Sequence, residues 1–216
     1  MRVVSGSAVH HPLFARVYAK VLSRNEPAEV RRHREELLAG LSGRVLEVGA
    51  GNGGNFRRYP ETVTEVVAVE PEPYLREQAR AAAAQVAVNV TILDGVADAL
   101  PVEDGSCDAA VACLVLCSVP DQASALVELH RVLRPGGELR FYEHVKADTP
   151  RMARWQRVVD RTFWPRAFGG CHTTRDTVAA IGAAGFAIER HRDLRLRSVP
   201  ACLPVVPHAI GVARRA

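Results

Sequence analysis

Residues 44–54 read Arg-Val-Leu-Glu-Val-Gly-Ala-Gly-Asn-Gly-Gly, and this stretch decides the fold. Its first half is a short apolar run, which predicts a buried strand over 44–48. Its second half is a glycine cluster, which allows a sharp turn and a close approach of the backbone to a ligand. A helix that opens after such a loop directs its N–H groups at that ligand. The stretch therefore predicts a strand, a loop and a helix that build a ligand site.

The glycine cluster fits two different ligand motifs. Gly49, Gly51 and Gly54 satisfy G-x-G-x-x-G, which is typical of NAD and FAD sites. Glu47, followed by Gly49, Gly51 and Gly53, also satisfies Glu-x-Gly-x-Gly-x-Gly, which is found where the ligand is S-adenosylmethionine. A carboxylate suits a cationic sulfonium ligand better than a diphosphate, because like charges repel. Glu47 therefore favours S-adenosylmethionine.

Outward from this stretch, strand and helix patterns alternate, as in the βαβ units of a mostly parallel sheet. Strands are predicted at 44–48, 65–70, 90–93, 108–113 and 138–142, with a final strand pair within 186–214. Helices are predicted within 8–41 and at 73–86 and 121–133, the last capped by Asp121. Glu70, at the end of the second strand, can accept hydrogen bonds from both ribose hydroxyls of either ligand.

Composition and charge narrow the class of protein. The chain has 216 residues, 48% apolar residues and a net charge of +4, which fits one α/β domain and excludes a disordered chain. The five cysteines form no C-x-x-C pair, so we expect neither a disulfide framework nor a metal site. The polar N-terminus predicts no signal sequence, no apolar run is long enough to span a membrane, and we expect a cytoplasmic protein. No nucleic-acid module is visible.

Four ordered motifs carry a family resemblance. They are residues 45–53, 69–71, 95–101 and the Leu-Arg-Pro-Gly-Gly of 133–137. Together they resemble the class I S-adenosylmethionine-dependent methyltransferases. The resemblance implies a Rossmann-like α/β fold with helices on both faces of a seven-stranded sheet of order 3-2-1-4-5-7-6, strand 7 antiparallel. It implies S-adenosyl-L-methionine as cofactor and S-adenosyl-L-homocysteine as product.

The same resemblance implies which residues bind the cofactor. Glu47 is expected near the methionine amino group, Glu70 at the ribose and Pro71 against the adenine. Many members carry an aspartate where Val96 stands, so Asp98 or a backbone carbonyl must replace its bond to the adenine amino group. The full cofactor set is Glu47, Gly49, Ala50, Gly51, Asn55, Glu70, Pro71, Val96, Ala97 and Leu114.

A narrower resemblance covers the chain from about Arg34 to its C-terminus. Residues 113–119, 142–145, 155–156, 170–177 and 203–211 are similar to the methyltransferase-like 7 family, whose animal members methylate alkyl thiols. This similarity implies S-methylation of a small-molecule thiol. Two departures from this family are expected: no apolar membrane anchor like the one with which animal members begin, and an altered segment at 163–168.

The acceptor side is expected to carry histidines, because methyl transfer to a thiol needs only a weak base. We predict His144 and His172 as catalytic residues. The residues predicted to bind the substrate are Tyr18, Cys117, Trp155, Cys171 and His208. An apolar strand end raises a thiol pKa, so Cys113 and Cys117 are interpreted as pocket wall.

One domain is expected to use the whole chain. It divides into an N-terminal helical lid (1–41), a cofactor-binding core (42–145), a cover insert (146–177) and a C-terminal helix with a strand pair (178–216). Residues 151–166 combine arginines with tryptophans, which indicates a cover helix with a solvated basic face, a site that attracts an anionic substrate, or a peripheral membrane surface.

Alternatives stay open at this stage. Within the class, the acceptor can be an amine or hydroxyl of a small metabolite, or a phospholipid amine. From other classes, the sequence permits an NAD(P)-dependent oxidoreductase or a non-catalytic ligand-binding scaffold. The expected partner is a small-molecule methyl acceptor, and the protein is expected to be a monomer or a homodimer.

Overall fold

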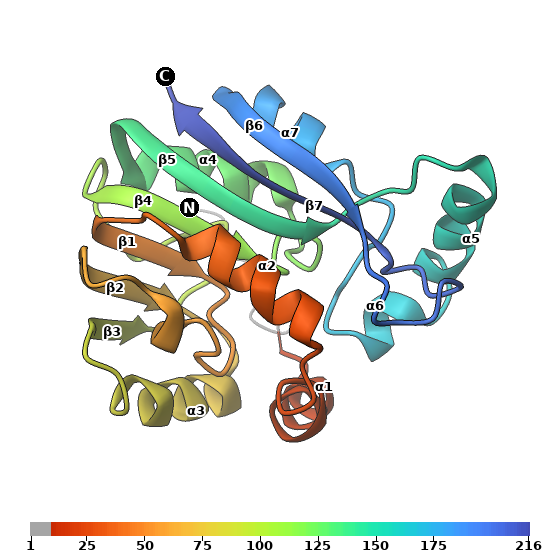
Figure 1. Cartoon of the computed structure of the whole chain (residues 1–216), viewed down its shortest axis with the longest axis horizontal. Helices are drawn as coiled ribbons and strands as arrows, with labels where there is room; N and C mark the ends of the chain where they lie inside the picture. The colour runs from red at the N-terminus through yellow and green to blue at the C-terminus, as the bar shows by residue number, and fades with distance from the viewer. Residues whose placement is uncertain (1–9) are drawn as a thin grey trace.

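Seven strands form one sheet in the order β3-β2-β1-β4-β5-β7-β6 in the computed structural model, which describes residues 10–216 (Figure 1). The strands are β1 (Gly43–Val48), β2 (Val63–Val69), β3 (Asn89–Leu93), β4 (Cys107–Cys113), β5 (Leu133–His144), β6 (Phe186–Arg195) and β7 (Pro207–Arg215). The first five strands run parallel, and β7 runs antiparallel to both β5 and β6. The expected fold class and strand order are confirmed.

Helices cover both faces of the sheet (Figure 1). They are α1 (Pro12–Val17), α2 (Ala28–Leu38), α3 (Pro73–Ala83), α4 (Gln122–Val132), α5 (Pro150–Asp160), α6 (Trp164–Ala167) and α7 (Thr177–Ala183). The predicted cap of α4 is confirmed, since the Asp121 side chain accepts hydrogen bonds from two backbone N–H groups of the first turn. The first nine residues of the expected lid, and the polar N-terminus that argued against a signal sequence, lie outside the described residues.

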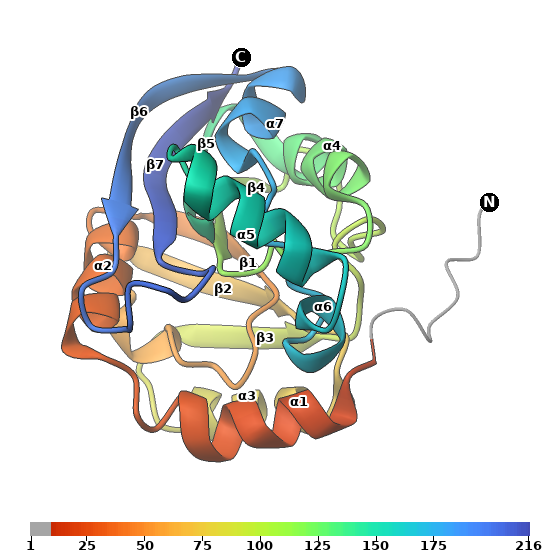
Figure 2. The same ribbon diagram turned by 90° about the vertical axis from the view of Figure 1, so that its right-hand side faces the viewer.

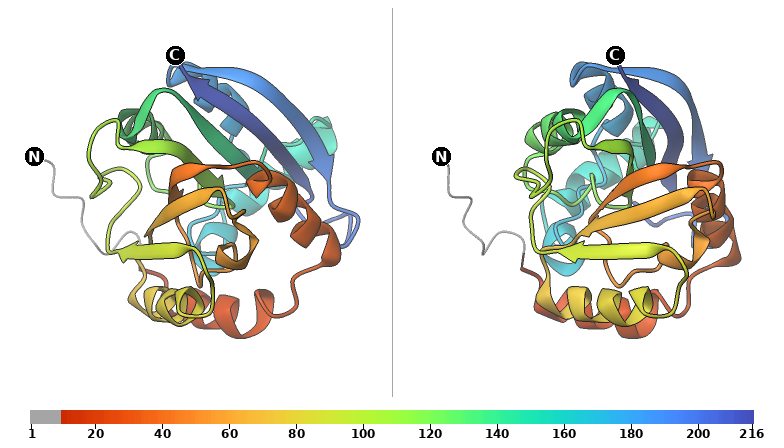
Figure 3. Two further views of the ribbon diagram at one scale, coloured as in Figure 1. Left: turned by 60° about the vertical axis from the view of Figure 1, so that its left-hand side comes forward. Right: turned by 90° about the vertical axis from the view of Figure 1, so that its left-hand side faces the viewer.

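Alternating side chains of the central strands fill two apolar cores. In β4, Ala110 and Ala112 pack in one core with α4, and Ala109 and Val111 pack in the other with α2. Successive side chains of a strand point to opposite faces, so a strand that is buried on both faces is apolar throughout. Figure 3 shows the twist that carries the sheet from β3 to β6.

The prediction of a helix after the glycine loop is wrong. Only a single 3-10 turn, η3 (Phe56–Arg58), follows the loop. Tyr59 is extended (ψ 132°), as a residue before a proline prefers, and Pro60 prevents the turn from growing into an α-helix. The helix expected over 73–86 also ends early, at Ala83.

The carboxyl ends of the parallel strands face three further segments. Figure 2 looks onto this end of the sheet, with α5 and α6 in front of the strands and α1 below them. α1 continues as a π-helical turn, η2 (Tyr18–Leu22), and π-helical turns are frequent at functional sites. None of the helices among residues 10–216 is long and apolar enough to cross a membrane.

Candidate active site

A cavity opens at the carboxyl ends of β1 to β4, where ligands of open α/β sheets bind. Its walls come from the segments that follow β1, β2, β3 and β4 and from the N-terminal helix. The predicted residues on its wall are Tyr18, Gly49, Gly51, Glu70, Pro71, Val96, Ala97 and Leu114. Three of the four sequence motifs, 45–53, 69–71 and 95–101, therefore meet around one space.

Two glycines of the loop allow close packing under the cavity. Gly49 has φ 64°, and a Cβ on it would lie 2.3 Å from Cγ2 of Val115. Gly51 has φ 58°, and a Cβ there would lie 3.4 Å from the ring of Tyr18. A side chain at Gly49 would clash with the loop after β4 and adopt an unfavourable backbone conformation, so this position requires glycine. The loop is thus held between η2 and the segment after β4.

Glu70 is the carboxylate that the cavity exposes to a ligand. It accepts hydrogen bonds from the N–H of Gly51 at 2.8 Å and from the N–H of Glu72 at 2.9 Å. Burial raises the pKa of Glu70, although these two N–H donors oppose the shift. The carboxylate is fixed by backbone on both sides, so its remaining lone pairs can accept the two hydroxyls of a ribose.

The chemistry of the wall separates the two candidate cofactors. Glu70 and Glu72 both lie on it, and none of the described residues that line it is a lysine or an arginine. A diphosphate would meet carboxylates there without a lysine or an arginine to offset them, whereas a ligand with a sulfonium and an ammonium is attracted. Leu75, Val96 and Ala97 supply an apolar wall for an adenine ring. The residues present fit S-adenosylmethionine.

Glu47 lies behind the glycine loop and outside the set of residues that line the cavity. Its carboxylate accepts hydrogen bonds from Asn55 at 2.8 Å and from the hydroxyl of Tyr59 at 2.9 Å. Burial raises the pKa of Glu47 to about 6, against these hydrogen bonds. Ala50 and Asn55 are likewise buried behind the wall. Glu47 and Asn55 thus support the loop from below, and Ala50 is the buried residue within it.

Arg34 is a buried residue of this region that the sequence analysis did not assign to the site. It donates to Asn55 at 2.9 Å and to the sulfur of Cys113 at 3.1 Å, and it pairs with Glu26 at 2.6 Å. Its position on α2 carried a signal, because Arg34 shares the buried face of the helix with Leu37 and Leu38. A charged residue on an apolar helix face requires polar partners in the core.

A sharp turn follows β4. Leu114 has φ 59°, a left-handed conformation that is unusual for a residue with a side chain. After this turn the N–H groups of Val115, Leu116 and Cys117 all donate to the carboxylate of Glu143, at 2.9 to 3.2 Å. The buried Glu143 therefore ties the loop after β4 to the end of β5.

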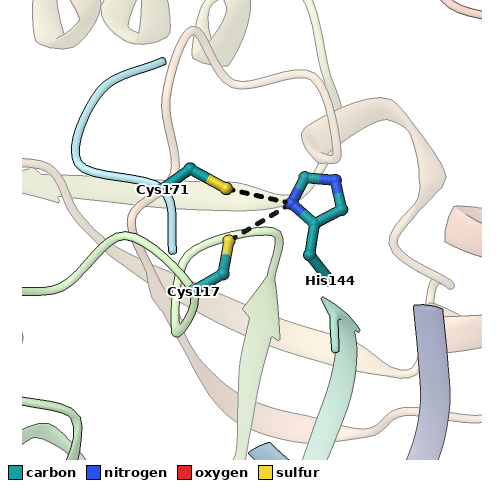
Figure 4. Close-up of side chains that lie close together, drawn as sticks. All are labelled: Cys117, His144 and Cys171. Carbon is teal, nitrogen blue, oxygen red and sulfur yellow. Dashed lines mark hydrogen bonds between the residues drawn. The ribbon is translucent and has the colours of Figure 1, made fainter. Parts of the chain in front are cut away.

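Three polar side chains meet beside this turn (Figure 4). The sulfur atoms of Cys117 and Cys171 each lie 3.4 Å from Nδ1 of His144. The hydrogen bond with Cys117 holds the pKa of Cys171 well below its ordinary value, with further help from His144, although burial opposes it. Burial would lower the pKa of His144, but the charges of Cys171 and Glu143 outweigh it and raise that pKa.

Cys113 and Cys117 have the raised pKa that the sequence predicts, and of the two only Cys113 lies on the cavity wall. Burial raises the pKa of Cys113 to about 11. The hydrogen bond with Cys171, together with burial, raises the pKa of Cys117 well above its ordinary value. Within the Cys117–Cys171 pair, therefore, Cys171 is the thiol that ionises first.

The remaining predicted acceptor residues are divided by the structure. His208 is buried beside the cluster, its ring 4.6 Å from that of His144, and burial holds its pKa well below the ordinary value. His172 is fixed through its backbone N–H, which donates to the carbonyl of Cys117 at 2.7 Å, and its ring is not part of the cluster. Trp155 is 44% exposed on α5 and donates to the carbonyl of Cys202 at 3.1 Å.

Comparison with known families gives one domain match and several close relatives. Residues 46–141 match a family model described as a methyltransferase domain. Thiol S-methyltransferase TMT1A of Homo sapiens is 36% identical over 185 residues, which cover 82% of this chain and 73% of that protein. Thiol S-methyltransferase TMT1B of Rattus norvegicus is also 36% identical, over the same shares of both chains.

Solved structures show the same fold at lower identity. A putative sarcosine dimethylglycine methyltransferase from Galdieria sulphuraria superposes with a TM-score of 0.73 at 16% identity, covering 94% of this chain and 98% of that one. A geranyl diphosphate methyltransferase superposes with a TM-score of 0.67 at 16% identity, covering 99% of this chain and 87% of that one. At such identities the likeness shows the fold alone.

Proposed function

Since the chain belongs to the methyltransferase-like 7 family of S-adenosylmethionine-dependent methyltransferases, we propose that it methylates the sulfur of a small-molecule thiol. Relatives that are themselves thiol S-methyltransferases support this acceptor class. The observation that carries the proposal is the Cys117–His144–Cys171 cluster, which adjoins the cofactor cavity: Ser118, the residue after Cys117, lies on its wall.

We assign the cofactor to the cavity wall. Glu70 holds the ribose hydroxyls, and Pro71, Val96 and Ala97 contact the adenine. Glu47 attracts the ammonium from behind the glycine loop, whose backbone packs under the methionine part. When bound, the cofactor supplies a methyl group on a sulfonium, which a nucleophile attacks from the side opposite the sulfur. Tyr18, over Gly51, shields this wall from water.

The acceptor lies on the other side of the cavity. A thiol with a pKa of about 8.5 is only partly ionised at neutral pH, and its thiolate is the nucleophile. The task of the acceptor side is therefore to position the sulfur and to hold it as a thiolate. We assign that task to Cys117, His144 and Cys171, which are the polar groups gathered where the loops after β4 and β5 meet. Positioning alone can contribute about 7–11 kcal/mol to the rate.

A panel of acceptors tests this function. Purified protein is incubated with S-adenosylmethionine and one simple alkyl thiol, amine, phenol or carboxylate, and S-adenosylhomocysteine is measured with the methylated product. We expect turnover with the thiol to exceed that with every other acceptor by at least about tenfold. Glu70→Ala, which loses the cofactor contact, serves as the negative control. Preferential methylation of the amine or the phenol would overturn the thiol assignment.

Calorimetry addresses the oxidoreductase alternative, which finds no support among the relatives. S-adenosylhomocysteine and NADP are titrated separately into the same protein. The acidic wall without lysine or arginine predicts binding of the former and no measurable binding of the latter. Tight NADP binding alone would contradict the cofactor assignment.

A further inference from the structure

The two sulfurs and the imidazole of the cluster point at one another from three separate segments (Figure 4). Cys117 comes from the loop after β4, His144 ends β5, and Cys171 lies in the segment after α6. Their ligating atoms Sγ, Nδ1 and Sγ all lie within 4.8 Å of one another. Among residues 10–216, this is the one group of three or more cysteine, histidine or acidic side chains with that geometry.

The spacing fits a tetrahedral metal ion. Around zinc, sulfur ligands lie at about 2.3 Å and nitrogen ligands at about 2.0 Å, so a sulfur and a nitrogen on adjacent tetrahedral positions are about 3.5 Å apart. Each sulfur of the cluster lies 3.4 Å from Nδ1 of His144. An ion could therefore enter between the three atoms with little movement of the backbone.

Hydrogen bonds already hold the three ligands relative to one another. The N–H of Cys117 donates to Glu143, the residue before His144, at 3.2 Å. The carbonyl of Cys117 accepts the N–H of His172, the residue after Cys171, at 2.7 Å. Metal sites need ligands that surrounding contacts orient in advance. The hydrogen bonds of Cys117 with Glu143 and with His172 provide such contacts.

One unsatisfied donor lies in the same buried cluster. Trp164 packs there with Cys117 and Cys171, and its buried indole N–H has no hydrogen-bond partner among the described residues. A buried donor without a partner costs free energy, and a metal-bound thiolate is the kind of acceptor that would satisfy it. Two thiolates would also neutralise the charge of a divalent ion, so that the loaded cluster carries no net charge into the protein interior.

We propose that Cys117, His144 and Cys171 bind a zinc ion, and that its fourth position takes the acceptor thiol. Three protein ligands with one open position are the pattern of catalytic zinc sites, and two cysteines with one histidine form one of its known ligand sets. Two of the segments that carry the ligands reach the cofactor cavity. Ser118, next to Cys117, and Gly169, two residues before Cys171, both lie on its wall. The role of the fourth position rests on the proposed thiol methylation, whereas metal binding does not.

The step balances without a redox change. The acceptor thiol releases its proton to solvent when its sulfur binds the ion as a thiolate. A lone pair of that sulfur then forms the new bond to the methyl carbon, and the sulfonium carbon–sulfur bond breaks with its electrons staying on the cofactor sulfur. The neutral thioether is a weak ligand and leaves the ion, which keeps its charge throughout.

Metal titration tests the site directly. The full chain is stripped with EDTA in a non-thiol reductant and titrated with zinc chloride against a chromophoric chelator. We expect one ion per chain, and at least about 100-fold weaker binding in Cys117→Ser, Cys171→Ser and His144→Ala, because even outer-shell changes cost 10–100-fold. Cys202→Ala removes the exposed thiol and should bind like wild type. Retained S-adenosylhomocysteine binding shows that each variant is folded. Wild-type affinity no higher than that of Cys117→Ser overturns the site.

Cobalt chloride and 2-mercaptoethanol test the fourth position. Tetrahedral cobalt bound by thiolates has a near-ultraviolet charge-transfer band and intense visible bands, and we expect both bands to change when 2-mercaptoethanol is added. An unchanged spectrum, or full thiol methylation by metal-free protein, overturns the metal role and leaves the proposed function standing. Metal binding in a protein that methylates no thiol has the opposite meaning: the site stands, and the proposed function falls.

Discussion

The cavity wall that we assign to the cofactor side and the neighbouring Cys117–His144–Cys171 cluster that we assign to the acceptor side are built in different ways. On the cofactor side, the site is formed mainly by backbone: a glycine loop packs against Val115 and Tyr18, and two N–H groups hold Glu70. On the acceptor side, the site is formed by side chains, because Cys117, His144 and Cys171 meet from three segments of the chain. The first side needs a short motif, whereas the second needs the completed fold.

This difference predicts that substitutions on the two sides affect different measurements. A change on the cofactor side should alter affinity for S-adenosylhomocysteine. A change on the acceptor side should alter turnover and leave that affinity intact, because none of the three clustered side chains lies on the described wall of the cofactor cavity.

His144→Ala should have the largest effect. It removes the group to which both sulfurs are directed, so turnover of an alkyl thiol should fall by about 10²-fold or more, because a small misplacement of the reacting sulfur can cost that much. S-adenosylhomocysteine affinity, measured by calorimetry, should stay within about threefold of wild type. A parallel loss of affinity and turnover would show that the two sides are not separate.

Glu70→Ala should lower the affinity for S-adenosylhomocysteine. It removes the acceptor for the ribose and leaves the N–H groups of Gly51 and Glu72 without their partner. Each hydrogen bond to a charged group contributes about 1.5–3 kcal/mol, so S-adenosylhomocysteine should bind about 100-fold more weakly. Glu70→Gln keeps one acceptor oxygen and should lose less. Wild-type affinity in both variants would mean that the ribose lies elsewhere.

The same contrast explains what the sequence could predict. The strands, the glycine loop and Glu70 follow from local patterns that are contiguous or come in a fixed order. The strand order came from the family resemblance that these motifs carry. The short turn at 56–58 could have been predicted too, since Pro60 prevents a longer helix. The Cys117–His144–Cys171 cluster could not be predicted from the sequence. Its residues are brought together by strand pairing and a long insert, and no local spacing links them. Cysteine spacing alone therefore predicted no metal site.

The pH dependence of cofactor binding tests how Glu47 contributes. Burial raises the pKa of Glu47 to about 6, and an ammonium nearby would favour the ionised form and lower that pKa. Affinity should therefore be nearly complete at about pH 7 and fall as the pH drops through 6, becoming about tenfold weaker at pH 5 than at pH 7. Glu47→Gln should bind more weakly and lose this dependence. A flat wild-type profile would show that Glu47 only supports the loop through Asn55 and Tyr59.

Tyr18→Phe should produce the smallest change in S-adenosylhomocysteine affinity. It tests the role of the N-terminal helical segment. The ring of Tyr18 covers Gly51 on the cavity wall, and burial raises the pKa of its hydroxyl, although the nearby Arg34 opposes the shift. Phenylalanine keeps the apolar cover and loses one polar contact, so S-adenosylhomocysteine affinity should fall by about two- to fivefold. If the N-terminal helix only packs on the sheet, the substitution should lower the melting temperature without changing affinity. If the helix is a lid over the cofactor, affinity should change at constant melting temperature.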